Sequence, residues 1–495
     1  MKFSRRGILV GAAATGVGAL AVSSIWNTSD AAAEPQPLRI PPLLDARKHG
    51  NSVALDVRAG QTEFYSGRAS NTLGYNGSYL GPTLRLYRGD DVELAVTNQL
   101  REDTTVHWHG LLIPAELDGG PHQRIPPNAT WRPVLPVRQA GATLFYHSHA
   151  HGQTGAQVYS GLAGLLLIAD DQEESLGLPT EYGVDDLPLV LQDRQFENGY
   201  MVAPGGMMSR MAGWRGDTIV VNGTPNAVTR VPGQRVRLRL LNGSNARIFN
   251  LSFSDRRSFH WIASEGGLLN APVSLKSISL APGERAEILV DFSDRKVVAL
   301  QTAPDTNLPM MMGPLSRIRE FGDDLFGSNG ERILQFEPFL GEEPSTPLPE
   351  RLASRPPLNT SRIERRRRFV LGMGGMGGGM MGGMGSTGGM TINGRAFAMD
   401  RVDERIELGS TEIWEVSSDM MSHPFHIHGV QFEVMSRNGG KPLERDAGSR
   451  DTVVVREPVE LLVRFEQPAV EAPFMYHCHI LEHEDDGMMG QFATV

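Results

Sequence analysis

The sequence contains a single cysteine, Cys478, among its 495 residues. Because a disulfide within one chain needs two cysteines, disulfides cannot hold this fold together. Basic clusters are also scarce, since 47 Lys and Arg face 57 Asp and Glu and the formal net charge is -10. An acidic chain without a basic face is not expected to bind nucleic acid. We interpret its one basic run, residues 365–368, as a solvated loop.

Long apolar runs are missing too, and none beyond the N-terminus reaches the length that spans a membrane. The first 33 residues resemble a targeting segment: Arg5 and Arg6 precede an apolar, Gly/Ala-rich stretch, and small residues occupy 31–33. We predict a twin-arginine signal peptide over 1–33, recognised by the twin-arginine export machinery, and a periplasmic product without membrane attachment after cleavage. An ordinary secretory signal or a chance pair of arginines is the alternative.

Convincing long helices are absent, and one strand pattern occurs three times. Alternating apolar and polar residues follow Gly89, Gly233 and, more weakly, Gly409. Alternation with period two is typical of a strand with one face on a core. We therefore predict an all-β fold of three consecutive β-sandwiches, in keeping with about 150 residues per domain. The expected domains are 34–172, 173–305 and 306–495, the last with a linker and a Met/Gly-rich insert over 372–390.

Histidines are concentrated in four short segments of the first and third domains. These segments contain ten of the 14 histidines: His107, His109, His147, His149, His423, His426, His428, His477, His479 and His483. In a strand, the two rings of a His-x-His pair point to one face about 6–7 Å apart, so they reach neighbouring metal ions more easily than they chelate one. We predict a metal cluster between the first and third domains. For His49, His122, His151 and His260 we expect surface or core positions.

Cys478 lies between His477 and His479, so in a strand its side chain points away from theirs. It should therefore serve a different metal ion. Two histidines, one cysteine and a weak axial methionine form a blue-copper electron-transfer site. His423, His483 and Met488 are available to complete that set. A lone cysteine is more often a buried apolar residue, and the surrounding histidines favour the metal role here.

The segments around His423–Gly429 and His477–Met489 resemble the ligand motifs of the multicopper oxidases, most closely those of the three-domain periplasmic cuprous oxidase and laccase-like group. The resemblance implies three cupredoxin-like Greek-key β-sandwiches and four copper ions per chain. It assigns His423, Cys478, His483 and Met488 to type 1 copper and His107 and His426 to type 2 copper. It assigns His109, His147, His149, His428, His477 and His479 to the type 3 pair, with O2 as the electron acceptor.

Two carboxylates match acidic positions that the resemblance places beside the cluster, Asp118 and Glu484. Reduction of O2 to water consumes four protons, and carboxylates near the cluster can deliver them. We expect both to act as catalytic proton relays. The alternatives are a turn aspartate and a surface glutamate.

Methionines suggest the electron donor, because thioethers bind Cu(I) well. By resemblance, Asp419 and Met421 match ligands of a substrate Cu(I), and we expect contributions from Met373, Met376, Met380, Met381 or Met384 in the insert. An additional labile copper would bind there. Phenols or Fe(II) are possible further donors, and the implied role is periplasmic copper tolerance. A flexible glycine-rich loop with incidental methionines is the alternative.

Other functions are compatible with parts of this pattern. They are a general laccase without a role in copper homeostasis, a copper-binding protein without turnover, and a structural relative associated with cell division that lacks copper ligands. Copper nitrite reductases lack the paired type 3 histidines that this chain retains. The complete ligand set favours an oxidase, which we expect to be a monomer.

Overall fold

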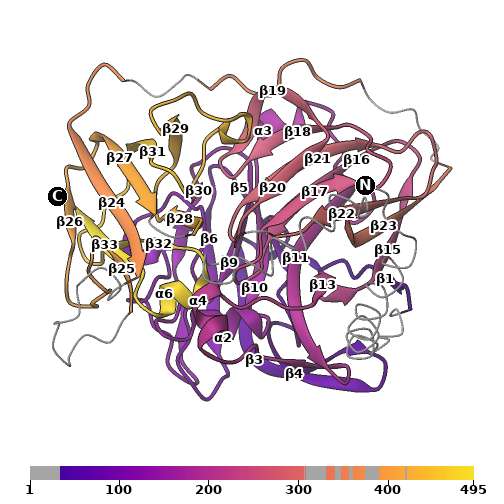
Figure 1. Ribbon diagram of the computed structural model, residues 1–495, viewed down its shortest axis with the longest axis horizontal. Helices are drawn as coiled ribbons and strands as arrows, with labels where there is room; N and C mark the ends of the chain where they lie inside the picture. Colours follow the sequence, from indigo (N-terminus) through magenta and orange to yellow (C-terminus); the bar gives the residue numbers. More distant parts are fainter. Residues whose placement is uncertain are drawn as a thin grey trace, which may run out of the picture. The chain divides into compact units, whose positions relative to one another are not determined.

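The computed structural model describes residues 34–305, 307, 330–340, 347–355, 360–373, 389–418 and 421–495. The predicted signal peptide lies outside these residues. Strands dominate the fold (Figure 1), and the all-β prediction is confirmed. The helices are short: α2 (Thr154–Tyr159), α3 (Asp171–Glu174), α4 (Met207–Ala212), α6 (Leu481–Asp485) and the 3-10 turns η1 (Ala46–His49), η2 (Ala115–Leu117) and η4 (Glu444–Asp446). Within the described part, no helix combines the length and apolarity needed to cross a membrane.

The first sandwich encloses its core between two sheets. One sheet has the order β2 (Leu43–Asp45), β5 (Thr83–Tyr87), β10 (Ala163–Ala169) and β9 (Ala142–His147). The other has β4 (Arg68–Tyr75), β3 (Ser52–Tyr65) and β6 (Asp91–Asn98), with β7 (Thr130–Trp131) and β8 (Val134–Pro136) beside β6. Trp108, which separates His107 from His109, is fully buried in this core. Its burial turns the two flanking histidines to the opposite side.

The second sandwich has the largest sheets. One has the order β1 (Gln36–Pro37), β15 (Ala227–Pro232), β23 (Glu331–Phe339), β22 (Val298–Ala303), β17 (Phe249–Phe253) and β20 (Ser277–Leu280). The other has β14 (Thr224–Pro225), β13 (Thr218–Val221), β11 (Asp186–Glu197), β16 (Arg235–Asn242), β21 (Arg285–Asp291), β18 (Phe259–Ser264) and β19 (Gly267–Leu275), with β12 (Tyr200–Val202) beside β11. Trp261 is buried in the core between them.

The third sandwich carries the remaining histidine segments. One sheet has the order β25 (Met390–Ile392), β24 (Arg365–Met373), β27 (Thr411–Ser418), β31 (Val459–Arg464) and β29 (Phe432–Arg437). The other has β26 (Glu404–Ile406), β33 (Met489–Thr494), β32 (Phe474–Cys478), β28 (His423–Ile427) and β30 (Thr452–Val455). Strands β28 and β32 lie side by side (Figure 1). Their shared core contains Trp414, Cys478 and Met488.

The three predicted signature strands are β6, β16 and β27, and each begins two residues after its glycine. Each also pairs in parallel with an earlier strand of its own sandwich: β3, β11 and β24, respectively. The repeated sequence pattern therefore corresponds to a repeated topology. β16 differs in being buried on both faces. Its outer face carries Arg237 and Arg239, which form buried ion pairs with Glu173 and Glu287.

Two observations differ from the sequence-based expectations. Strand β23 pairs with β15 and β22, so the second sandwich extends past residue 305, where we expected it to end. The basic run 365–368 is part of strand β24 rather than a solvated loop, so that interpretation was wrong. Its charges are matched by acidic neighbours: Arg366 pairs with Glu460, and Arg367 pairs with Glu412. Charge pairing across strands allows a basic segment to join a sheet.

Candidate metal centre

Strands β28 and β32 sort the candidate ligands of the third sandwich onto two faces. Their register places His426 opposite His477 and Phe425 opposite Cys478. Since side chains alternate along a strand, His426 and His477 share one face, whereas His423 and Cys478 share the other. His428 and His479 directly follow the two strands and extend the first face. The opposite orientation that the sequence predicted for Cys478 therefore agrees with the strand geometry.

The first sandwich brings its two histidine pairs against that first face. A backbone bridge joins His107 to His147, at the end of β9. Across the two sandwiches, the His149 ring lies next to His477, with 3.2 Å between their Nε2 atoms. His428 Nε2 lies 3.1 Å from the same His477 nitrogen. Eight histidines thus converge, all of them buried: His107, His109, His147, His149, His426, His428, His477 and His479.

Hydrogen bonds to the protein fix which ring nitrogen faces the cluster. Backbone carbonyls accept the Nδ1–H of His107, His147, His426 and His477, and the Asp118 carboxylate accepts that of His428. A ring that donates through Nδ1 carries its lone pair on Nε2, which is the arrangement expected of a metal ligand. The Nε2 atoms of His107, His147 and His426 have no hydrogen-bond partner among the described residues.

His109 has the reverse arrangement. Its Nε2 lies 3.1 Å from the Asp451 carboxylate, and its buried Nδ1 is without a partner in the described part of the chain. For His479, both ring nitrogens are buried and unpartnered there. A buried polar atom without a partner costs about 1–3 kcal/mol, so converging lone pairs of this kind are destabilising unless a cation binds them. The donor set therefore fits metal ions.

The distances between donor atoms support the same conclusion. Each of the following groups offers ligand atoms within 4.8 Å of one another: His107, His109 and His147; His107, His426 and His428; His149, His428 and His477; His109, His426 and Asp451; His423, Cys478 and His483. The first four groups lie in the cluster and overlap, which suits several neighbouring ions. The last group is separate and consists of the two histidines and the cysteine predicted for type 1 copper.

Burial keeps six rings of the cluster neutral. Desolvation is the largest cause that lowers the pKa of His109, His147, His149, His426, His428 and His479 well below the ordinary value, and the charges of neighbouring histidines lower it further. Protonating one ring therefore disfavours protonation of the next. Neutral imidazole is the form that binds a metal ion.

The separate group surrounds Cys478. Its Sγ lies 3.3 Å from His423 Nδ1 and 3.8 Å from His483 Nδ1, and the backbone N–H of Ile480 donates to the same sulfur. Burial raises the pKa of the Cys478 thiol far above its ordinary value. A thiolate at this position therefore requires a cation beside it. Met488 is buried in the same core, and its backbone carbonyl accepts the N–H of Cys478.

Helix α4 of the second sandwich covers the ring of His483. The Met211 carbonyl accepts the Nε2–H of His483 at 3.1 Å, and the ring is fully buried. Next to it, the backbone N–H of Trp214 donates to Glu482. Burial raises the pKa of Glu482 to about 7. Nothing in the sequence indicates that α4 covers His483, because the contact joins distant segments of the chain.

The two predicted carboxylates occupy equivalent positions on either side of the cluster. Asp118 Oδ2 lies 2.7 Å from His428 Nδ1 and 3.2 Å from His107 Nδ1. Glu484 lies 3.3 Å from His149 Nδ1 and 3.1 Å from His477 Nδ1. Each carboxylate thus touches one histidine from the first sandwich and one from the third.

Only some of the residues predicted to bind substrate Cu(I) lie in the described part of the structure. Asp419, Met376, Met380, Met381 and Met384 lie outside the described residues, as does the side chain of Met373. Met421 is buried in the core of the third sandwich. The backbone of Met373 pairs with Met390 at the ends of β24 and β25, so the two ends of the insert are neighbours.

The four remaining histidines do not belong to any of the donor groups. His49 and His151 are exposed, His122 contacts Gln491, and His260 lies in β18 of the second sandwich.

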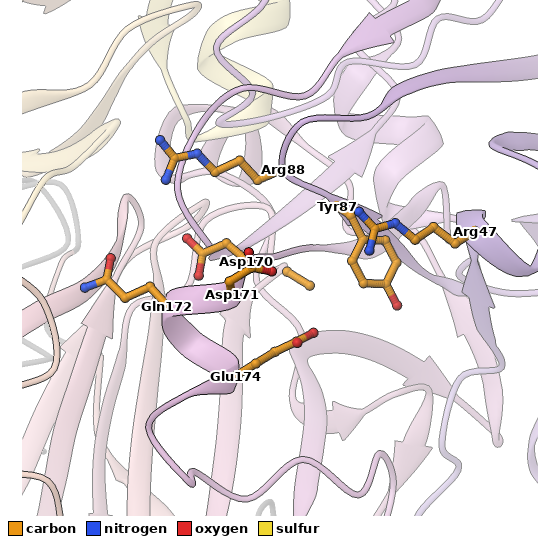
Figure 2. A pocket seen from close by; sticks show the side chains of 8 residues that line it. Arg47, Tyr87, Arg88, Asp170, Asp171, Gln172 and Glu174 are labelled. Atoms are coloured by element: carbon orange, nitrogen blue, oxygen red, sulfur yellow. The ribbon is translucent and has the colours of Figure 1, made fainter.

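A pocket of about 360 Å³ (Figure 2) shares no lining residue with either donor set. Its lining consists of Arg47, Tyr87, Arg88, Ala169, Asp170, Asp171, Gln172 and Glu174, none of which is a candidate ligand. Arg47 already pairs with Asp90 and lies over the Tyr87 ring.

Comparisons with known proteins agree with this geometry. Models of the multicopper oxidase family match residues 56–173, 199–301 and 376–495. The chain is 38% identical to the multicopper oxidase mco of Staphylococcus aureus, over 92% of each chain. It is equally identical to the cell division protein FtsP of Salmonella typhimurium, over 100% of this chain and 99% of that protein. Among solved structures, it resembles the laccase-like multicopper oxidase CueO of Ochrobactrum sp., with 37% identity, a TM-score of 0.82, and coverage of 93% and 100%.

Proposed function

Because the chain belongs to the multicopper oxidase family, we propose that it is an oxidase that passes electrons from a reducing donor to O2. When bound, a mononuclear copper supplies one-electron transfer from the donor, and a three-copper cluster supplies the four-electron reduction of O2 to water. His423, Cys478, His483 and Met488 would hold the first ion. The eight converging histidines would hold the other three.

The observation that carries this proposal is the segment His477-Cys478-His479. Its cysteine faces one donor set, while His477 and His479 face the other, so consecutive residues join two candidate metal sites. His477 Nδ1 also donates to the Cys478 carbonyl at 3.0 Å, which adds a hydrogen-bonded connection beside the covalent one. A storage protein needs no such connection between its sites.

Asp118 and Glu484 are suited to hold protons that the reaction consumes. Asp118 accepts a hydrogen bond from His428 through Oδ2, and its buried Oδ1 has no partner among the described residues. Neither oxygen of Glu484 has a partner with hydrogen-bond geometry there. These oxygens are free to take a proton and pass it toward the cluster. We propose both as general acids.

We propose Cu(I) as the principal donor, with Fe(II) and phenols as further donors. The base of the Met/Gly-rich insert supports this choice, because a Cβ added at Gly487, next to Met488, would lie 3.2 Å from the carbonyl oxygen of Met390. The insert therefore starts and ends beside the electron-accepting site. The burial of His483 under α4 also favours a small ion over a bulky phenol, since a phenol ring needs direct contact with the imidazole edge.

Two variants separate the possible roles of the insert. Replacing residues 374–388 by a short Gly/Ser turn keeps the β24–β25 pair and removes the whole segment. A second variant keeps the length and changes Met376, Met380, Met381 and Met384 to Ser. We expect both to weaken Cu(I) oxidation, and only the shortened variant to raise phenol turnover. Unchanged Cu(I) kinetics in both variants would remove any copper-gathering role.

Oxygen consumption tests the oxidase proposal directly. Copper-loaded protein should oxidise four equivalents of a one-electron donor for each O2 consumed, without releasing peroxide. A two-electron stoichiometry, or no oxygen consumption by protein with a full copper complement, would contradict it. We also propose a periplasmic location through the twin-arginine pathway, and a role in copper tolerance.

A role in cell division is the second candidate. The observation that favours it is the full-length similarity to FtsP at 38% identity. A purely structural role does not need twelve candidate copper ligands, however. A strain that lacks the gene separates the two: copper sensitivity that only an intact Cys478 rescues indicates an oxidase, whereas a division defect rescued by Cys478→Ser indicates the structural role.

A further inference from the structure

A buried ion pair connects the second sandwich to the histidine cluster. Arg285, the first residue of β21, donates two hydrogen bonds to Asp451: Nη1 to Oδ1 at 2.7 Å and Nη2 to Oδ2 at 2.6 Å. Both side chains are fully buried. Gly110 of the first sandwich packs against this pair, because a Cβ there would lie 2.7 Å from both Arg285 and Asp451. All three sandwiches thus meet at one ion pair.

Asp451 in turn contacts candidate ligands from two sandwiches. Its Oδ1 lies 3.1 Å from Nε2 of His109, and its backbone carbonyl accepts the Nδ1–H of His426 at 2.8 Å. The hydroxyl of Thr452 donates to Asp451 Oδ1 at 2.9 Å and lies 3.3 Å from His109 Nε2. The carboxylate is therefore held by Arg285 on one side and faces His109 on the other.

This arrangement explains why His109 differs from the other rings of the cluster. An ionised carboxylate only accepts hydrogen bonds, so it favours a proton on the nitrogen that faces it. A carboxylate that is fixed by two hydrogen bonds from one guanidinium also cannot rotate away. His109 Nε2 must then donate, and its lone pair lies on Nδ1, the buried atom without a partner among the described residues.

We propose that the Arg285–Asp451 pair is the positioning device by which the second sandwich orients His109 and His426 for copper. No described residue of the second sandwich belongs to a donor group, and this pair gives that sandwich a role in assembling the cluster. The proposal rests on the proposed function only in taking the cluster to bind copper. Arg285 and Asp451 are positioning residues, because they act through the two histidines.

A structural role at the interface is the competing explanation, and the structure offers a way to separate the two. A second buried ion pair, between Arg450 and Glu265, also joins the third sandwich to the second. The interface therefore does not depend on Arg285 alone. Within the third sandwich, Arg437 and Asp446 form another pair with two hydrogen bonds, from Nε and Nη2 of the arginine, with both distances at 2.7 Å and both residues buried. Asp446 does not belong to any of the donor groups.

The matched variants are Asp451→Asn and Asp446→Asn. We expect Asp451→Asn to weaken copper binding at the cluster about 10–100-fold, the usual effect of losing the partner of a metal-binding histidine. The blue absorption of the mononuclear site should persist at full intensity per chain. Asp446→Asn should keep the full copper content. Equal copper loss in both variants, or full copper in Asp451→Asn, would overturn the positioning role.

A measurement on the metal-free wild type does not depend on either variant folding. Nitrogen NMR of labelled histidine reports which ring nitrogen carries the proton. We expect His109 to carry it on Nε2, and His107, His147 and His426 to carry it on Nδ1. A proton on Nδ1 of His109 would refute the proposal. If the wild type binds no copper, the proposed oxidase function is refuted, whereas the protonation pattern of the histidines in the metal-free protein is unaffected.

Discussion

Acidification of the metal-free protein should destabilise it, because its ligand histidines are buried in the neutral form. Desolvation is the largest cause that lowers the pKa of seven of them well below 6.5, and it lowers the pKa of His483 to about 4. Unfolding exposes these rings to water, where their pKa returns to about 6.5. Below that pH the unfolded chain binds more protons than the folded one, so the free energy of unfolding decreases as the pH decreases.

The size of the effect follows from the number of groups. Each of the eight rings contributes stability that is fully present above pH 6.5 and is lost as the pH falls toward its folded pKa. When the pH falls from 7 to 5.5, the eight rings together lower the free energy of unfolding by about 10 kcal/mol, at about 1.4 kcal/mol per pKa unit. That is comparable with the whole stability of an ordinary domain, about 5–15 kcal/mol.

Buried acids oppose this loss. Burial raises the pKa of Glu265 and Glu482 to about 7 and that of Asp485 to about 8. A carboxyl group with a raised pKa binds its proton earlier in the folded state, so it stabilises the fold as the pH falls. Over the same pH interval these three groups raise the free energy of unfolding by about 5 kcal/mol. The histidines outweigh them, and we expect a net loss of about 5 kcal/mol from the two effects.

Urea unfolding of metal-free protein at pH 7 and at pH 5.5, followed by tryptophan fluorescence, measures this difference. The first transition should shift to lower urea at pH 5.5. Copper-loaded protein should shift much less, because the metal occupies the nitrogens that would be protonated. Replacing the exposed His49 with Gln should leave the shift unchanged. Equal transition midpoints at the two pH values would refute the view that these rings are buried and neutral.

Three further predictions concern single residues. Cys478→Ser should abolish the blue absorption and lower the copper content by one ion per chain, with the other ions retained, as metal analysis would show. Gly213→Ala should raise phenol turnover, because Gly213 has a φ of +76° and an added Cβ would lie 2.3 Å from a neighbouring side chain, which lifts α4 away from His483. The control Gly205→Ala adds its Cβ to open space and should change nothing. Asp118→Asn should lower kcat about 100-fold with the KM of the donor unchanged, as expected for loss of a proton donor.

The sequence predicted those features that depend on local periodicity. Strands β6, β16 and β27 were expected because alternation along a strand is visible in a single sequence. The same alternation gave the opposite orientations of Cys478 and its neighbours, which the register of β28 and β32 supports. Spacing within a strand is fixed by the backbone, so no information about distant segments was needed.

Features that depend on distant segments were not predictable. Strand β23 begins at Glu331, beyond the expected domain boundary, and only its pairing with β15 shows that it belongs to the second sandwich. Arg285 follows an ordinary turn, and nothing in its neighbourhood in the sequence indicates a partner 166 residues away. The same holds for the contact of Met211 with His483. A single sequence shows each of these residues, but it does not show which distant residues contact one another.

Overall identity to relatives does not identify the function of this chain. It is 38% identical both to a multicopper oxidase and to a cell division protein, so the fold alone is compatible with either. The ligand residues are more informative, because they are costly to keep. Buried ring nitrogens without partners destabilise the metal-free fold, and apolar side chains of similar size would remove that cost. A chain that used this fold only as a scaffold would gain stability by losing those histidines, whereas this chain retains all ten together with Cys478 and Met488.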